Sequence, residues 1–358
     1  MKQSNLNNSI KQIFTILVSL LVITQLVAAS KIKTKAHSPR LVCTSSWNVA
    51  ESDPPAKLDV WINPECDVIV VGMQEAVLIQ GLTGLKNIAL SDSSIEKQRK
   101  KWKEAILTHL GNNFKYVQYA KKEFVVGILM LLFVKNSYYS EFSKDNVLKK
   151  NLDHFKVKTG THGLTGNKGA ISVRMQINGK MFSITNCHLE AHDENHAKRM
   201  EQLNKFLNTS YKYDSKKMLA KDHDYCIIMG DLNSRTQYQT ANKEQENIAV
   251  RAQITSILSS TKDFTPIFEH DQLATAIREG KELKNIGETA PKFAPTFKYD
   301  RNTDNFDSSK KQRIPSWCDR VIWVKSAPML ACQKSFSSVP SFKMSDHKPV
   351  IATFHIPA

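Results

Sequence analysis

Polar side chains suited to hydrolysis follow apolar, strand-like runs at six places along this chain. Each of these runs is closed or closely flanked by acidic, amide or histidine residues, namely Asn48, Glu75, His188, Asp231, Asn233, Asp319, Asp346 and His347. The ends of neighbouring strands meet at one edge of a sheet, where α/β folds place their sites. A lone residue of this kind would be an ordinary cap or turn residue, but six such positions predict one shared site.

These residue types match the requirements of metal-assisted hydrolysis of a phosphate ester. Mg²⁺ prefers oxygen ligands and keeps several waters, so one or two carboxylates hold it, and Glu75 is the expected ligand. Asp231 is expected to orient and deprotonate the attacking water, with Asn233 as hydrogen-bonding support. His347 would contact the phosphate, and Asp319 behind it would raise its basicity and fix its tautomer.

Eight short motifs along the chain carry a family resemblance. In order they are WNV, DVIVVGMQE, LTGNKGA, NCHLEAH, MGDLN, PTFKYD, RIPSWCDR and SDHKPV. Over about residues 40–357 the chain resembles the inositol polyphosphate 5-phosphatases, within the larger class of DNase I-like endonucleases, exonucleases and phosphatases. GDLN or SDHKP alone would be weak, since the nucleases carry similar strings, whereas RIPSWCDR preceded by PTFKYD is specific to the 5-phosphatases.

The resemblance implies a fold and an activity. The fold would be a four-layer α/β sandwich, in which two packed mixed β-sheets are flanked by helices. The activity would be Mg²⁺-dependent removal of the 5-phosphate from phosphatidylinositol 4,5-bisphosphate or from soluble inositol polyphosphates. An anionic membrane surface is then an expected partner, no nucleic acid is expected, and the chain is expected to be a monomer.

The resemblance also implies roles for matching residues. Asn48 would lie near the metal or its water, His188 would contact the scissile phosphate and assist the departing oxygen, and Asp346 would complete the metal-side network. The neighbouring 4-phosphate would be recognised by Tyr299, Lys311 and Arg313. The side of the 1-phosphate would be lined by Asn167, Lys168 and His192. Three positions depart from the family pattern: Ala50 after WNV, Ser234 after GDLN, and Glu190 within NCHLEAH.

Charge and composition fit this hypothesis without choosing it. The 358 residues carry a formal net charge of +16, and 41% are hydrophobic, which is typical of a globular protein. A basic surface attracts nucleic acid, anionic lipid or a phosphorylated sugar alike. Two alternatives stay open: a phosphodiesterase on the same fold, such as a secreted nuclease or a sphingomyelinase, and an inactive phosphoinositide-binding module.

The six cysteines do not have the spacing of a disulfide framework or of a zinc site. Cys43, Cys187 and Cys226 lie inside apolar, strand-like runs. A thiol in that setting is usually a small buried hydrophobic group. The sequence therefore predicts buried free thiols at these three positions.

Residues 1–35 have the anatomy of a targeting segment. Lys2 and Lys11 precede an apolar run, Ile13 to Val27, and small residues at 27 and 29 would allow cleavage after Ala29. The run is short for a bilayer, which needs about 20 apolar residues. An uncleaved signal anchor is the alternative. Either form predicts the secretory pathway or a membrane, and the catalytic domain would span residues 40–358.

Alternating strand-like and helical patterns after Arg40 predict an α/β domain. Strands are expected over Leu41–Val49, Asp67–Met73, Gly127–Val134, Gly169–Ile177, Lys180–Leu189, Tyr225–Met229, Arg320–Val324 and Val350–His355. Asn178-Gly179 predicts a two-residue hairpin and hence antiparallel pairing. Helices are expected over Ile95–Leu110, Glu194–Leu207 and Asn247–Leu258, and a loop over Asp300–Gln312.

Overall fold

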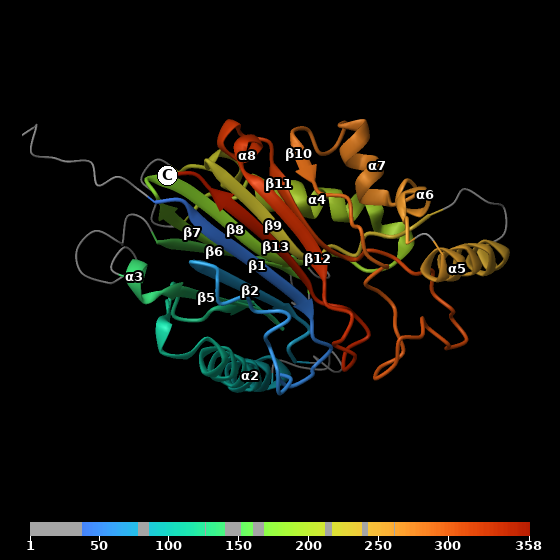
Figure 1. Cartoon of the computed structure of the whole chain (residues 1–358), viewed down its shortest axis with the longest axis horizontal. Helices are drawn as coiled ribbons and strands as arrows, with labels where there is room; N and C mark the ends of the chain where they lie inside the picture. The colour runs from blue at the N-terminus through green and yellow to red at the C-terminus, as the bar shows by residue number, and fades with distance from the viewer. Residues whose placement is uncertain are drawn as a thin grey trace, which may run out of the picture. The chain divides into compact units, whose positions relative to one another are not determined.

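A computed structural model describes residues 38–77, 86–125, 127–139, 152–159, 168–211, 217–237, 243–260 and 262–358. Residues Pro39 to Pro357 belong to one compact unit. Within this unit two β-sheets pack face to face, and helices cover their outer faces (Figure 1). The predicted targeting segment lies outside the described residues. Among the helices of the described part, none is long and apolar enough to cross a membrane.

The first sheet contains seven strands among the described residues, in the order β12-β13-β1-β2-β5-β3, with β4 also paired to β5. Its strands are β1 (Arg40–Asn48), β2 (Val68–Gln74), β3 (Phe114–Tyr116), β4 (Phe124–Val125), β5 (Ile128–Lys135), β12 (Gln333–Ser338) and β13 (Val350–Ile356). Strand β1 runs parallel to β2 and antiparallel to β13. The end of β1 therefore lies at the same edge as the end of β2 and the start of β13.

The second sheet contains six strands in the described chain, in the order β10-β11-β9-β8-β7-β6. They are β6 (Asp153–Lys158), β7 (Gly169–Ile177), β8 (Lys180–His188), β9 (Tyr225–Asp231), β10 (Ile286–Glu288) and β11 (Asp319–Val324). Strands β8 and β9 are parallel, with His188 opposite Asp231, while β11 is antiparallel to β9, with Asp319 opposite Asp231. The pairing places these three polar residues in one row.

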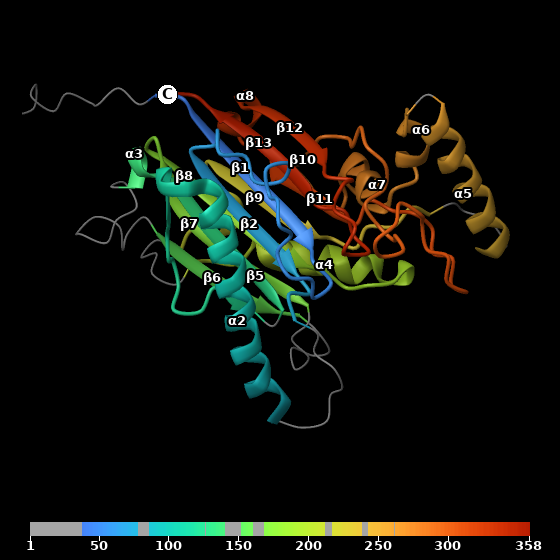
Figure 2. The same ribbon diagram turned by 60° about the horizontal axis from the view of Figure 1, so that its bottom comes forward.

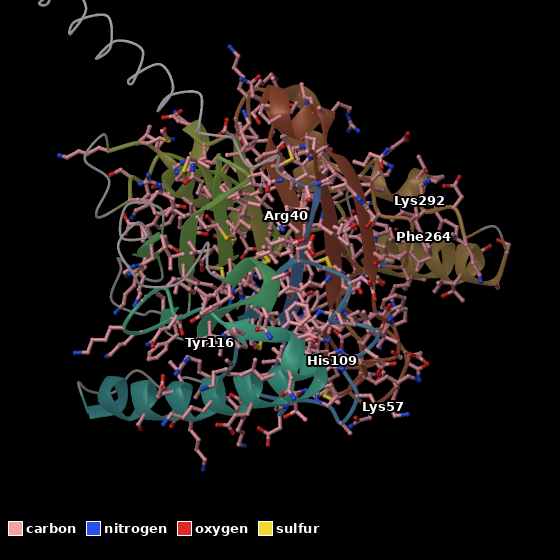
Figure 3. The ribbon with its side chains drawn as sticks, turned by 60° about the vertical axis from the view of Figure 1, so that its left-hand side comes forward. Arg40, Lys57, His109, Tyr116, Phe264 and Lys292 are labelled. Atoms are coloured by element: carbon pink, nitrogen blue, oxygen red, sulfur yellow. A yellow bond between two sulfur atoms is a disulfide. The ribbon has the colours of Figure 1, made fainter. Side chains whose placement is uncertain are left out.

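Alternating side chains of the strands divide between two cores. In β2, Val68 and Val70 face the core between the sheets, whereas Ile69 and Val71 face the outer core under α2 (Lys86–Leu110). Trp102 and Ile106 of α2 are fully buried in that outer core, as their helical spacing predicts. Figure 2 shows α2 lying across the first sheet, and Figure 3 shows Tyr116 of β3 near this helix and His109 in its last turn.

The outer face of the second sheet is covered by α4 (His196–Leu207) and α7 (Gln272–Glu279), which supply Leu203, Phe206 and Leu273 to a third core. Helices α5 (Lys243–Ser259) and α6 (Thr265–Phe268) pack around Trp317 in a fourth cluster. The remaining short elements are α3 (Asn136–Tyr139), α8 (Ala327–Ala331) and the 3-10 turns η1 (Gly111–Asn113), η3 (Asp193–Asn195) and η4 (Ala220–Asp222). The layers are thus helix, sheet, sheet, helix, as the resemblance implies.

All eight predicted strands and all three predicted helices are present, with ends that differ by a few residues, except that α2 begins nine residues earlier. The hairpin is confirmed: Asn178 and Gly179 have φ of 51° and 74°, and Ile177 pairs with Lys180. Both positive values suit a turn that follows the twist of the strands. No helix or strand interrupts the predicted loop at 300–312.

The prediction for Cys43 is wrong. Its sulfur is bonded to that of Cys66, and the two Cα atoms are 5.9 Å apart, a usual disulfide separation. The disulfide joins β1 to the segment that precedes β2. Cys187 and Cys226 are free and buried, as predicted. The pair could not be predicted from the sequence, because Cys66 lies in a loop and comes close to Cys43 only through the pairing of β1 with β2.

Candidate active site

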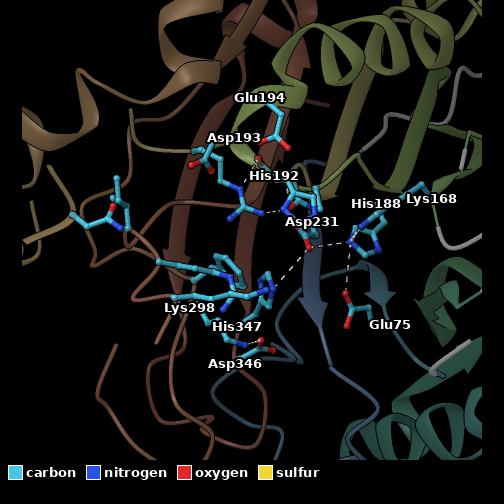
Figure 4. Close-up of a pocket in the computed structure, with 18 residues that line it drawn as sticks. Glu75, Lys168, His188, His192, Asp193, Glu194, Asp231, Lys298, Asp346 and His347 are labelled. Carbon is cyan, nitrogen blue, oxygen red and sulfur yellow. Dashed lines mark hydrogen bonds and ion pairs between the residues drawn. The ribbon is translucent and has the colours of Figure 1, made fainter. Parts of the chain in front are cut away.

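The polar residues that the sequence singles out converge at one edge of the two sheets. Asn48 and His188 end β1 and β8, Asp231 ends β9, and Glu75 directly follows β2. Strands β11 and β13 run in the opposite direction, so their starting segments, which carry Asp319, Asp346 and His347, reach the same edge. These side chains lie in or beside a cavity of about 410 Å³ (Figure 4).

Asp231 lies at the centre of the site, with its side chain almost fully buried. Its Oδ2 accepts a hydrogen bond from Asn48 Nδ2 at 3.0 Å and lies 3.2 Å from His188 Nε2, while Oδ1 accepts from the backbone N–H of Asn233 at 3.0 Å. Burial alone would raise the pKa of Asp231, but His347, His188 and Lys168 hold it below its usual range. The carboxyl group is therefore ionised at neutral pH, as a proton acceptor must be.

His347 and Asp319 form a buried pair beside Asp231. The Nδ1 atom of His347 is 2.9 Å from Asp319 Oδ2, which also accepts a hydrogen bond from Thr296 Oγ1, and Nε2 is 3.8 Å from Asp231 Oδ2. Burial alone would lower the pKa of His347, but the carboxylates of Asp319 and Asp231 raise it to about 10. The ring is thus a cation at neutral pH and can donate to a phosphate oxygen.

Glu75 lies on the opposite side of Asp231 from His347 (Figure 4). Its side chain is 41% exposed, and Oε1 is 3.8 Å from His188 Nε2. The same ring nitrogen contacts the Nζ atom of buried Lys168, and burial lowers the pKa of Lys168. A half-exposed carboxylate at the pocket edge fits a hard cation that keeps several waters. Asn48 fits it less well, because its oxygen accepts from the backbone N–H of Ala50 and its nitrogen faces Asp231.

Basic side chains form the other wall of the pocket. Lys298, Lys311 and Arg313 line it, and Arg313 Nη1 donates to buried Asp307 at 3.0 Å. The backbone N–H of Arg313 donates to the same carboxylate oxygen, also at 3.0 Å. Lys298 is paired with Asp346. This wall can therefore bind one phosphate group while His347 donates to a second, neighbouring phosphate group.

Two of the predicted residues lie elsewhere than expected. Tyr299 does not line the pocket: it is buried, its hydroxyl donates to Pro295 O at 2.8 Å, and its ring packs on Phe306. Asp346 lies beside Lys298 instead of on the side of Glu75, so it belongs to the basic wall and not to a metal-side network (Figure 4). The other predicted residues outside the centre, Lys168 and His192, line the pocket. Asn167 lies outside the described residues.

Four supporting residues were missed by the sequence argument. Lys298 belongs to the PTFKYD motif, so its position next to Tyr299 was a signal that could have identified it. Arg235 bonds to Asn233 Oδ1, and its guanidinium lies 4.8 Å from the ring centre of Phe297. The same ring packs on His347 at 4.5 Å. Trp47 Nε1 donates to His347 O at 2.9 Å, which no local pattern indicates.

Comparisons with known proteins agree with the motifs. The sequence profile of the endonuclease/exonuclease/phosphatase family 2 matches residues 45–353. Mouse inositol polyphosphate 5-phosphatase K is 29% identical over 87% of this chain and 64% of its own length. A phosphatidylinositol 4,5-bisphosphate 5-phosphatase of Saccharomyces cerevisiae is 31% identical over 87% of this chain. The chain spans only 31% of that yeast protein.

Solved structures confirm the fold. The inositol polyphosphate 5-phosphatase domain of a synaptojanin, bound to inositol (1,4)-bisphosphate and calcium, has a TM-score of 0.70 and 25% identity over 89% of this chain and 85% of its own. A Cimex nitrophorin, solved as a ferrous NO complex, has a TM-score of 0.61 and 20% identity over 90% of this chain and 99% of its own. The second likeness shows the fold alone, so the function has to be argued from the site.

Proposed function

Because this chain belongs to the endonuclease/exonuclease/phosphatase family 2, we propose that it removes the 5-phosphate from phosphatidylinositol 4,5-bisphosphate or from soluble inositol polyphosphates. The observation that carries this proposal is the position of the His347–Asp319 pair. It lies between Asp231 and a basic wall formed by Lys298 and Arg313. One end of the pocket can thus react with a phosphate while the other end holds its neighbour.

In the proposed mechanism, Asp231 accepts the proton of the attacking water. Asn48 and the backbone N–H of Asn233 hold this carboxylate in place, and the charges around it keep it ionised. The imidazolium of His347 donates to an oxygen of the scissile phosphate, and Asp319 keeps the ring protonated and oriented. His188, 3.2 Å from Asp231 Oδ2, would contact the same phosphate and assist the departing inositol oxygen as its bond to phosphorus breaks. The proton that Asp231 accepts from the water is then returned to that oxygen. Preorganised donors of this kind stabilise the charge of the transition state.

Mg²⁺ is the proposed cofactor, and Glu75 is the residue that would hold it. When bound, the cation would neutralise charge on the phosphate oxygens. The exposed carboxylate of Glu75 supports this assignment, and so does the calcium ion in the synaptojanin relative. We assign Asn48 to holding Asp231 instead of the metal, because its amide nitrogen faces that carboxylate.

The secretory pathway is the proposed location of this chain. The apolar run after Lys11 supports it, and so does the Cys43–Cys66 disulfide, because disulfides persist mainly in oxidising compartments. N-terminal sequencing of the natural protein tests the proposal. A start near Ser30 is expected if the segment is a cleaved signal, and an intact Met1 is expected if it is an anchor. A reduced Cys43 in the natural protein would contradict an oxidising compartment.

The activity is tested by measuring orthophosphate release from inositol 1,4,5-trisphosphate and from phosphatidylinositol 4,5-bisphosphate, with and without Mg²⁺. We expect release that depends on Mg²⁺, and Asp231→Ala is expected to lower turnover about a hundredfold or more, the scale of losing an acid–base group. Plasmid DNA and sphingomyelin test the phosphodiesterase alternative. A folded wild-type protein that cleaves either of these, and releases no phosphate from the first two, would refute the proposal.

A further inference from the structure

The segment between β8 and α4 holds a strained residue at the active-site pocket. His192 has φ of 73° and ψ of 151°, a backbone conformation that is essentially confined to glycine. Another residue keeps this conformation only where the surrounding structure fixes the backbone. His192 lines the pocket, and Figure 4 shows it on the side that carries Asp193 and Glu194. Strain at this place indicates that the position of the His192 side chain matters for what the pocket binds.

Arg199 of α4 holds three carbonyl groups of this segment. Its Nη1 atom donates to Glu190 O at 3.1 Å and to His192 O at 2.6 Å, and its Nη2 atom donates to Asp193 O at 3.4 Å. The side chain is buried, and no ion pair joins it to a carboxylate among the described residues. Burial lowers the pKa of Arg199 to about 10. The guanidinium is therefore still a cation at neutral pH and forms charge-assisted hydrogen bonds to neutral oxygens.

Two amide side chains complete this support. Asn195 Nδ2 donates to Ala191 O at 2.7 Å, and Gln272 Nε2 of α7 donates to Asp193 O at 3.1 Å. The Oε1 atom of Gln272 in turn accepts from Arg199 Nη2 at 2.5 Å. The carbonyl groups of residues 190 to 193 are thus all hydrogen-bonded to side chains, most of which come from the helices behind the segment. The backbone around residue 192 is fixed from several sides, as a strained conformation requires.

We propose that Arg199 and Gln272 are positioning residues, which hold His192 in its strained conformation so that its imidazole binds a phosphate group of the substrate. This inference rests on the proposed function for the identity of the substrate. The basic wall and His347 face two neighbouring phosphate groups, and His192 lies on another side of the pocket, where it binds a third (Figure 4). An imidazole N–H donates to a phosphate oxygen. A contact that is preformed in this way loses less entropy on binding than one made by a free loop.

A double-mutant cycle tests whether Arg199 acts through His192. Arg199→Met and His192→Ala are each expected to raise KM for inositol 1,4,5-trisphosphate roughly tenfold and to leave kcat within a factor of about two, because each removes a binding contact and no reacting group. The double variant should show the same increase as either single variant. Arg278→Met is the matched control, because Arg278 is exposed on α7 and donates to Glu269 O at 3.2 Å outside the active-site pocket.

Inositol 4,5-bisphosphate, which lacks the third phosphate group, separates positioning from a general loss of structure. In every variant of the cycle, KM for this compound should stay within a factor of about two of the wild-type value. Gln272→Met is the second variant if Arg199→Met does not fold, and it should raise KM for the trisphosphate about threefold, but not in the His192→Ala background. Effects that multiply in a double variant, or equal increases in KM for the two compounds, would overturn the proposal.

The strain and the binding are also measured without activity. In denaturant unfolding His192→Gly should be more stable than His192→Ala, because only glycine adopts this backbone conformation without strain. A less stable glycine variant would contradict the strain and with it the positioning. Calorimetry with inositol 1,4-bisphosphate repeats the cycle as a binding experiment. If the wild type hydrolyses no substrate but Arg199→Met and His192→Ala weaken this binding equally and non-additively, the positioning stands and the proposed function fails.

Discussion

At the scale of single residues, the site depends on buried charges that shift one another's pKa. Asp231 is kept ionised by the cations around it, whereas burial raises the pKa of Asp319 despite its contact with His347. The three side chains lie within a few ångströms, so each protonation state depends on the other two. The neighbouring carboxylates keep the imidazole of His347 protonated, and its positive charge therefore faces the pocket.

Replacement of Asp319 by Asn tests this coupling. The raised pKa of His347 means that its proton is held until high pH, so removing the neighbouring carboxylate should lower the pKa, by about 2 units. The alkaline limb of the kcat/KM profile should move to lower pH by the same amount. NMR titration of the His347 imidazole measures the first effect, and initial rates measure the second.

Thr296→Val is the matched control for Asp319→Asn. It removes the 2.7 Å hydrogen bond to the same carboxylate oxygen but keeps the charge. The pKa of His347 should therefore stay raised in this variant. An unchanged His347 titration in Asp319→Asn would show that the pair does not set the protonation of the ring.

The basic wall allows a second test, between two adjacent residues of the PTFKYD motif. Lys298→Met should raise KM for substrates with a 4-phosphate about tenfold, because the amine lines the pocket. Tyr299→Phe should leave KM within a factor of about two, since its hydroxyl is bonded to Pro295 O away from the pocket. The measurement is KM for inositol 1,4,5-trisphosphate. The opposite order of effects would restore Tyr299 as the phosphate contact.

The sequence predicts most of the site residues correctly because they lie at the ends of strands. The prediction fails for Tyr299, whose side chain is buried away from the pocket. A motif gives neighbours in the chain, but Lys298 and Tyr299 point to different surroundings. Tyr299 is held by its backbone pairing with Phe306 and by the hydrogen bond from its N–H to Asp346 O at 2.9 Å, which brings distant segments together. No local pattern predicts this pairing, so which of two adjacent residues enters the pocket has to come from the structure.

At the scale of elements, the loop that carries Lys311 and Arg313 is built around Asp307. The Oδ1 atom accepts from the backbone N–H of Ser309 at 3.1 Å, and Oδ2 accepts from both the backbone and the side chain of Arg313. Burial alone would raise the pKa of Asp307, but these hydrogen bonds lower it to about 2. The loop has no regular secondary structure, so its shape depends on hydrogen bonds such as those to this carboxylate.

The lowered pKa of Asp307 predicts an acid-dependent loss of stability. A carboxyl group whose pKa is lower in the folded state stabilises the fold above its unfolded pKa and loses this contribution as the pH falls toward the folded value. Between pH 5 and pH 3 the wild type should lose about 1 kcal/mol that Asp307→Asn does not lose. Urea unfolding at both pH values measures the difference. Asp59→Asn, in an exposed loop, should behave as the wild type does.

The central strands could be predicted from the sequence, whereas the edge strands and the short helices could not, and burial and length explain the difference. Strands such as β2 and β5 are apolar on both faces because both sheet faces are covered, so their composition is unambiguous. In the edge strands β6 and β12 more exposed residues alternate with less exposed ones, and both strands carry lysine, so they resemble loops. Helix α7, of eight residues, is too short for a helical period to stand out.

At the scale of the whole molecule, the disulfide links the site to the stability of the fold. Cys43 lies in β1, the strand that ends at Asn48, and Cys66 directly precedes the segment leading into β2 and Glu75. Both sulfurs are buried in the core under α2, beside Trp47 and Trp61. The bond therefore fixes the relative position of the two strands whose ends carry the proposed metal ligand and the support of Asp231.

The double variant Cys43→Ser/Cys66→Ser should lower the free energy of unfolding by about 3 kcal/mol, the contribution of closing a loop of this length in the unfolded chain. Denaturant unfolding of protein refolded with and without a thiol reductant measures it. The reductant should lower the stability of the wild type by a similar amount and leave the double variant unchanged, because the other cysteines of the described chain are free. If the reductant lowers the free energy of unfolding of both proteins equally, the stabilisation does not come from this bond.

The disulfide should also affect the metal requirement. Since the two strands carry Asn48 and the residue before Glu75, we expect the reduced wild type to require more Mg²⁺ for half-maximal phosphate release than the oxidised protein does.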